Sequence, residues 1–179
     1  MISNHKIISW NSAGIRACAN STPAKIGFFD QTFPKGSFDI AAFLETHHKD
    51  INDIPEAFKE YEMTHHMIHT PTQNETHGGI IIFISKDFKI VKQTDLLPGR
   101  LINVNLFHET EKTDLNISFF YGPQWNNINN AEAQNVIDLF AQNHSINENN
   151  IILGDFNFVE QDVDKGKKMT SKDKAVARI

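Results

Sequence analysis

Polar residues follow four apolar strand candidates, and their types could bind a metal ion. Asp155 and Asn157 come directly after the apolar run 151–153, close to the end of the 179-residue chain. Three earlier apolar runs end in the same way, at Asn11, Glu45 and Tyr121. Functional groups in α/β folds gather beyond the carboxyl ends of strands, so these residues can converge on one sheet edge. Carboxylate and amide oxygens are the ligands that Mg²⁺ prefers, and the sequence therefore predicts an acidic metal site.

The elements that would position these residues are strands framed by helices. The run 151–153 is continuously apolar, which predicts a strand buried on both faces, and 80–84 is the expected central strand. Other strands are expected at residues 6–11, 39–45, 90–94, 100–107 and 114–121, and a strand with a loop at 65–69. A capped helix is expected after Ser21, a short helical turn near Pro55, and a helix over 131–142 behind Asn130. This order predicts α/β layers in a single domain.

Composition and charge exclude several classes of protein. No apolar stretch approaches the roughly 20 residues that a membrane span needs, and no secretory signal is visible. With Cys18 as its lone cysteine, the chain cannot form an internal disulfide framework. We expect a soluble intracellular protein, nuclear or cytoplasmic, that is neither secreted nor bound to a membrane.

The net charge of -5 is unevenly distributed. Residues 161–179 hold six Lys or Arg against three Asp, whereas the preceding residues hold 11 basic against 19 acidic side chains. The basic segment could attract nucleic acid or could be ordinary solvated surface. The acidic body argues against tight non-specific DNA binding and suits a site that concentrates divalent cations.

Five short motifs occur in an order that resembles a known family. They are Trp10-Asn11 with Gly14, Leu44-Glu45-Thr46, Gly78-Gly79 before an apolar strand, Tyr121-Gly122-Pro123, and Gly154-Asp155-Phe156-Asn157. Together they resemble the endonuclease/exonuclease/phosphatase superfamily of metal-dependent phosphoesterases. The resemblance implies an α/β (α+β) fold, a layered sandwich of two mixed β-sheets flanked by helices. It places this domain at residues 1–160.

Within that superfamily, residues 43–47 and 155–164 look like the endonuclease domains of LINE-type (non-LTR) retrotransposons. Leu44 departs from the glutamine usual there, and Lys165 from a frequent arginine. The similarity to apurinic endonucleases of DNA repair is more distant. This resemblance implies DNA as the partner and fusion to a reverse transcriptase in the full-length protein.

The superfamily closes with a strand and a Ser-Asp-His motif, and no such sequence follows Asn157. The resemblance therefore implies a C-terminally truncated domain that lacks its final strands. Residues 161–179 would then be a basic tail or the start of a missing segment. Loss of the terminal histidine would lower activity, since a positioned acid or base contributes on the order of 10² to 10⁴ in rate.

The resemblance also implies a role for each site residue. Glu45 would hold Mg²⁺ or Mn²⁺ with help from Asn11, and Asp155 would orient or deprotonate the attacking water. Asn157 would hydrogen-bond that water or a phosphate oxygen, and Tyr121 would contact the phosphate or the departing oxygen. Arg100 and His47 are further candidates for binding substrate.

Three functions stay open from the sequence. The first is endonucleolytic nicking of DNA, the second is hydrolysis of a small phosphorylated substrate, and the third is a catalytically inactive remnant. Glu45, Tyr121 and Asn11 also have ordinary structural explanations, such as a solvated strand end or a turn. Asp155 with Asn157 favours a functional role, because a carboxylate buried beside an apolar strand is costly unless something compensates it. The histidine-rich stretches 47–48 and 65–69 could suggest zinc, but they lack a helical partner motif and favour a structural role.

Overall fold

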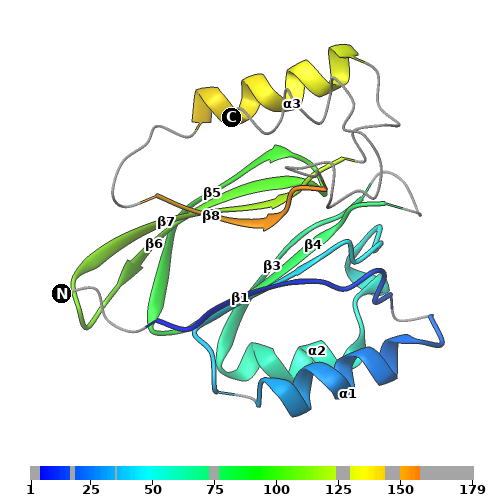
Figure 1. Ribbon diagram of the computed structural model, residues 1–179. Coiled ribbons are helices and arrows are strands. Elements are labelled where there is room, and N and C mark those ends of the chain that lie inside the picture. The colour runs from blue at the N-terminus through cyan, green and yellow to red at the C-terminus, as the bar shows by residue number, and fades with distance from the viewer. Residues whose placement is uncertain are drawn as a thin grey trace, which may run out of the picture.

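Two four-stranded sheets stacked face to face form the centre of the computed structural model, with helices on both outer sides (Figure 1). The structure describes residues 5–16, 19–34, 36–72, 77–123, 130–143 and 150–157. The expected layered sandwich of two mixed sheets flanked by helices is confirmed. The basic segment 161–179 and the proposed domain boundary at residue 160 lie outside the described residues.

The first sheet has the order β1-β2-β4-β3 and the second the order β5-β6-β7-β8. The pairs β1–β2 and β7–β8 are parallel, whereas all other neighbours are antiparallel. The strands are β1 (Ile7–Asn11), β2 (Ile40–Leu44), β3 (His65–Thr70), β4 (Ile80–Ser85), β5 (Phe88–Leu97), β6 (Leu101–His108), β7 (Thr113–Tyr121) and β8 (Asn150–Asp155).

Helices cover the outer face of each sheet. The helices α1 (Thr22–Thr32) and α2 (Glu56–Lys59) lie against the first sheet, and α3 (Asn130–Asn143) lies against the second (Figure 1). Two short 3₁₀ helices, η1 (Ile51–Asp53) and η2 (Glu60–Met63), flank α2. None of the helices in the described part of the chain is long and apolar enough to cross a membrane.

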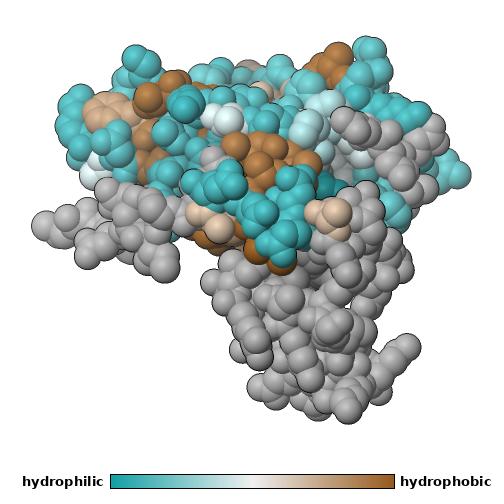
Figure 2. Space-filling model, turned by 90° about the horizontal axis from the view of Figure 1, so that it is seen from above, coloured by the Kyte–Doolittle hydropathy of each residue, from teal (hydrophilic) through white to brown (hydrophobic). Residues whose placement is uncertain are grey.

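The core consists of three apolar layers, and the largest lies between the two sheets. Strands β2 and β4 are buried along almost their whole length because sheet packs on one face and helix on the other. This explains their continuous Ile, Ala and Phe sequences. On the face seen from above in Figure 2, by contrast, the coloured residues are mostly hydrophilic with separate hydrophobic areas.

Strand β8 is less buried than its apolar sequence predicts. It is the last strand of its sheet in the described part of the chain, and the side chain of Ile152 is 37% exposed. Gly154 in β8 has no room for a side chain, because an added Cβ would collide with the carbonyl oxygen of Phe120 on β7.

The expected helix cap at Ser21 is correct in position only, since its side chain makes no capping hydrogen bond.

The buried His48 and the partly buried His69 pack edge to face beside the loop that follows β2. Their ring centroids are 5.7 Å apart, and Nδ1 of His48 lies 2.5 Å from Oγ1 of Thr46. Among the described residues, Nε2 of His48 and Nδ1 of His69 have no hydrogen-bond partner. Burial, together with the neighbouring His69, lowers the pKa of His48 to about 4, although the negative charges of Asp53 and Asp50 act to raise it. His48 is therefore neutral in the folded protein at pH 7.

This depressed pKa makes the protein sensitive to acid. Between pH 6.5 and about 4 the unfolded chain binds a proton at His48 and the folded chain does not, so stability falls as the pH falls. The shift corresponds to about 3 kcal/mol of unfolding free energy across this range. We expect His48→Gln to flatten the pH dependence measured by urea unfolding. The control His66→Gln should keep the wild-type slope, and an unchanged slope in His48→Gln would contradict the assignment.

Candidate active site

Parallel pairing in both sheets brings the strand-end residues to one edge of the sandwich. In the first sheet Asn11 is in register with Leu44, so the loop beginning at Glu45 leaves β2 beside the end of β1. In the second sheet Tyr121 is in register with Asp155. Four chain segments thus deliver their polar residues to the same edge, as the sequence predicted.

A side-chain hydrogen bond joins the two sheets at this edge. Nδ2 of Asn11 donates to Oδ2 of Asp155 over 2.7 Å, and Oδ1 of Asn11 accepts from the N–H of Ala13. The other carboxylate oxygen of Asp155 accepts the N–H of Asn157 over 2.9 Å. Asn157 has a left-handed backbone (φ 52°), which asparagine tolerates better than most residues, and its Nδ2 donates to the carbonyl of Gly122. Asp155 is thereby held in a fixed orientation.

Tyr121 links these residues to the carboxylate of Glu45. Its phenol lies close enough to the side chains of Glu45 and Asn157 for both to influence its pKa. Burial and the negative charge of Glu45 raise the pKa of Tyr121 to about 12, so the phenol keeps its proton at neutral pH. A protonated phenol beside a carboxylate is a hydrogen-bond donor that can be redirected to another anionic oxygen.

Arg100 supplies positive charge behind this tyrosine. Its guanidinium lies over the Tyr121 ring, 5.2 Å from the centroid, and Nη1 is 3.4 Å from the Tyr121 carbonyl oxygen. Burial lowers the pKa of Arg100, while Tyr121 and Glu45 act in the opposite direction. An arginine remains charged at neutral pH in such surroundings.

The loop after β2 presents Glu45 and His47 through an unusual backbone conformation. Both residues have positive φ, 55° and 61°, a conformation that costs non-glycine residues on the order of 1–3 kcal/mol. Backbone hydrogen bonds enforce it, since the N–H of His47 donates to the carbonyl of Gly78 and that of Thr46 to Gly79. Oε1 of Glu45 is 3.3 Å from Nε2 of His47, and both side chains are about one-fifth exposed, at 18% and 19%.

Lys25 fixes the loop that follows β1. From α1, its Nζ donates to three consecutive carbonyl oxygens, those of Ser12, Ala13 and Gly14, over 2.8, 2.5 and 2.8 Å. This loop carries the N–H that orients the amide of Asn11. The sequence analysis did not single out Lys25, because contacts with backbone carbonyls leave no pattern in side-chain types.

All seven residues singled out from the sequence lie together. Contacts connect Asn11, Asp155, Asn157, Tyr121, Glu45 and His47 in that order, with Arg100 on the tyrosine ring. The side-chain oxygens of Glu45, Asn11 and Asp155 are of the kind that a hard divalent cation prefers. Positive charge and neutral donors beside such a set could bind an anion such as a phosphate.

The histidine-rich stretches show no metal site in the described residues. His65 is buried, with Nδ1 2.8 Å from Oγ1 of Thr64 and Nε2 3.4 Å from the carbonyl of Phe38. Burial lowers the pKa of His65, which favours its neutral form. The structural role expected for this stretch agrees with these contacts.

Solved structures with a similar fold come from several enzymes. TDP2 of D. rerio, complexed with a single-strand DNA product, is 13% identical with a TM-score of 0.61, covering 91% of this chain and 65% of that one. An AP endonuclease from Leishmania major is 15% identical with a TM-score of 0.59, covering 94% and 60%. The human Nocturnin catalytic domain is 15% identical with a TM-score of 0.60, covering 86% and 64%.

The chain thus spans just under two thirds of the length of these three chains, and at such identities the likeness concerns the fold. Comparison with the sequences of curated proteins gives no match. A family model does match, over residues 8–171, and its members are phosphoesterases and nucleases that generally use divalent metal ions. The match covers nearly the whole chain, and the chain belongs to the Endonuclease/Exonuclease/phosphatase family.

Proposed function

We propose that this chain hydrolyses phosphodiester bonds in DNA with the help of Mg²⁺ or Mn²⁺, as the nicking domain of a retroelement protein. The observation that carries the proposal is the continuous set of contacts from Asn11 to Glu45 across both sheets. Phosphoester hydrolysis needs a cation site, an oriented water and donors for phosphate oxygens in one place. This edge of the sandwich brings suitable groups for all three together.

The cation would be held by Glu45 and Asn11, where it would neutralise charge on the phosphate. Asn11 already directs its amide N–H to Asp155, and its amide oxygen, which accepts the N–H of Ala13 with one lone pair, has a second lone pair for the cation. The same hydrogen bond keeps the Asp155 carboxylate next to this position. Its oxygens can therefore accept a proton from an attacking water.

The remaining residues would act on the phosphate. The neutral phenol of Tyr121, with its raised pKa, can donate to a phosphate oxygen or to the departing oxygen. The amide of Asn157 and the guanidinium of Arg100 flank that phenol and can hydrogen-bond with other oxygens of the substrate. His47, in contact with Glu45, would lie next to the bound phosphate.

DNA as the substrate class and the retroelement context rest on resemblance. A TDP2 with bound DNA product and an AP endonuclease are among the proteins of similar fold. The motifs at 43–47 and 155–164 look like those of LINE-type endonuclease domains. A protein of this kind would leave a nicked strand for a reverse transcriptase carried on the same polypeptide.

The carboxylates of the site provide the direct test. With Mg²⁺ and supercoiled plasmid, we expect Glu45→Gln and Asp155→Asn each to reduce the nicking rate by at least about 100-fold, because each removes a charge needed in the transition state. Asp138→Asn is the matched control, since Asp138 is exposed on α3 and accepts a hydrogen bond from Gln134 one turn earlier in the same helix. EDTA should abolish nicking.

Three outcomes would contradict the proposal. Nicking that survives EDTA or Glu45→Gln would remove the metal assignment. A wild-type chain that cleaves p-nitrophenyl phosphate but not plasmid would favour a small phosphorylated substrate. A chain that cleaves neither would be an inactive remnant.

Lys25 provides a second test, of positioning rather than chemistry. Replacing it with Met removes three hydrogen bonds to the loop beside Asn11, and misplacement by about 1 Å can cost up to about 100-fold in rate. We expect Lys25→Met to lower kcat for plasmid nicking by about tenfold or more, with little change in KM. Raising the Mg²⁺ concentration should partly restore the rate.

Lys59→Met is the control for Lys25, because Lys59 is exposed and contacts Glu56 on the same helix. If Lys25→Met lowers the unfolding free energy but leaves kcat and its Mg²⁺ dependence unchanged, Lys25 has a structural role alone.

A further inference from the structure

A second group of metal-ligating side chains lies at the opposite end of the sandwich. His5 precedes β1 by two residues, His108 ends β6, and Glu111 lies in the turn between β6 and β7. His5 and Asn11 are six residues apart along an extended strand, so the two sites are separated by about 20 Å. The group thus shares no residue with the candidate active site.

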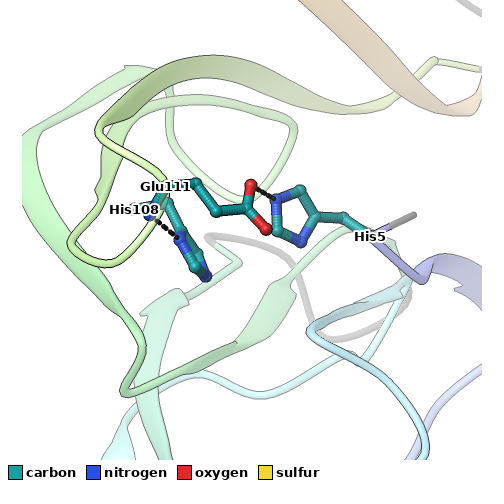
Figure 3. Close-up of side chains that lie close together, drawn as sticks. All are labelled: His5, His108 and Glu111. Carbon is teal, nitrogen blue, oxygen red and sulfur yellow. Dashed lines mark hydrogen bonds and ion pairs between the residues drawn. The ribbon is translucent and has the colours of Figure 1, made fainter. Parts of the chain in front are cut away.

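The three side chains point toward one another (Figure 3). Each offers one ligand atom, and these atoms all lie within 4.8 Å of one another. Nε2 of His5 is 3.2 Å from Oε2 of Glu111, and the two imidazole centroids are 5.0 Å apart. Phe88, itself buried, packs edge-on against both imidazoles, at 5.0 and 4.7 Å. An apolar residue therefore supports the two rings while the Glu111 side chain, 31% exposed, remains open to solvent.

We propose that His5, His108 and Glu111 form a binding site for a divalent transition-metal ion of the Zn²⁺ type. Two imidazoles with one carboxylate, completed by water, are a common ligand set for Zn²⁺. Mg²⁺ and Ca²⁺ prefer oxygen ligands alone, which distinguishes this group from the oxygen-rich site around Glu45. The ion would connect the start of β1 in the first sheet to the β6–β7 turn of the second.

Binding would require a small local rearrangement. Donor atoms around a tetrahedral Zn²⁺ are about 3.3 Å apart, given bonds of about 2.0 to 2.1 Å, so the widest pair must close by roughly 1.5 Å. The exposed turn that carries Glu111 can supply this movement. The N–H of Glu111 now donates to Nδ1 of His108 over 3.1 Å. His108 must give up that hydrogen bond, either to free Nδ1 or to move its proton there and free Nε2.

Asp39 adds a feature that metal-bound histidines commonly have. Its Oδ2 lies 3.8 Å from Nδ1 of His5 and is already fixed by the N–H of Lys6 over 2.7 Å. A carboxylate on the far side of a ligating imidazole fixes the ring and raises its basicity. With Nε2 of His5 directed at Glu111 and Nδ1 at Asp39, the ring has the orientation that such a site uses.

The experiment is a Zn²⁺ titration of chelator-treated protein, followed by calorimetry and by the thermal midpoint. Co²⁺ is the spectroscopic probe, since it gives visible absorption bands when four-coordinate. We expect Zn²⁺ to raise the midpoint of the wild type and Co²⁺ to give these bands. His5→Gln, His108→Asn and Glu111→Gln should each weaken Zn²⁺ binding by more than about tenfold.

Two controls make the result specific. Glu109→Gln alters an exposed carboxylate of the same turn and should bind Zn²⁺ like the wild type. Glu45→Gln should keep the bands and the stabilisation, because it alters the other end of the sandwich. Glu111→Gln keeps the test valid if the histidine variants fold poorly, since Glu111 lies in an exposed turn.

Loss of the Zn²⁺ response in Glu45→Gln but not in Glu111→Gln would place the ion at the candidate active site and overturn the proposal. A wild type that neither binds Zn²⁺ nor develops Co²⁺ bands would also overturn it. Neither result depends on whether the chain cleaves DNA.

Discussion

The hydrogen bond between Asn11 and Asp155 is the interaction on which the candidate active site depends. Each residue ends a strand of a different sheet, and the 2.7 Å contact between their side chains joins the two sheets at one edge. Apolar packing holds the sheets face to face but sets their relative position only loosely, because hydrophobic contact is not directional. A directional bond between Nδ2 and a carboxylate oxygen supplies the register that apolar packing lacks.

Local sequence patterns were sufficient to find the strands and the polar residues at their ends. An apolar run followed by a polar residue is a local signal, so Asn11, Glu45, Tyr121 and Asp155 could be identified without knowing which strands pair. The run 80–84 is likewise the buried central strand β4 that its composition predicted. The four strand-end residues converge on one edge because β1–β2 and β7–β8 pair in parallel, and hydrophobic periodicity alone does not specify these pairings.

Features that depend on pairing or on backbone contacts were not predictable. The run 151–153 does not reveal whether another strand follows in the sheet, and Ile152 is in fact partly exposed. In the described part of the chain, the ammonium group of Lys25 hydrogen-bonds with carbonyl oxygens, which every residue has. His5 and His108 lie far apart in the sequence, one before β1 and the other at the end of β6. They come together because the two sheets are stacked.

In the loop that contains Glu45 and His47, main-chain hydrogen bonds set the left-handed backbone, whereas the side chains set the chemistry. The hydrogen bonds to Gly78 and Gly79 come from the main-chain N–H groups of His47 and Thr46 and do not use their side chains, although the positive φ of Glu45 and His47 disfavours β-branched residues there. The loop can therefore exchange its functional groups while keeping its path. A fold built in this way allows new ligands or new substrate contacts to arise by single substitutions, without a new backbone.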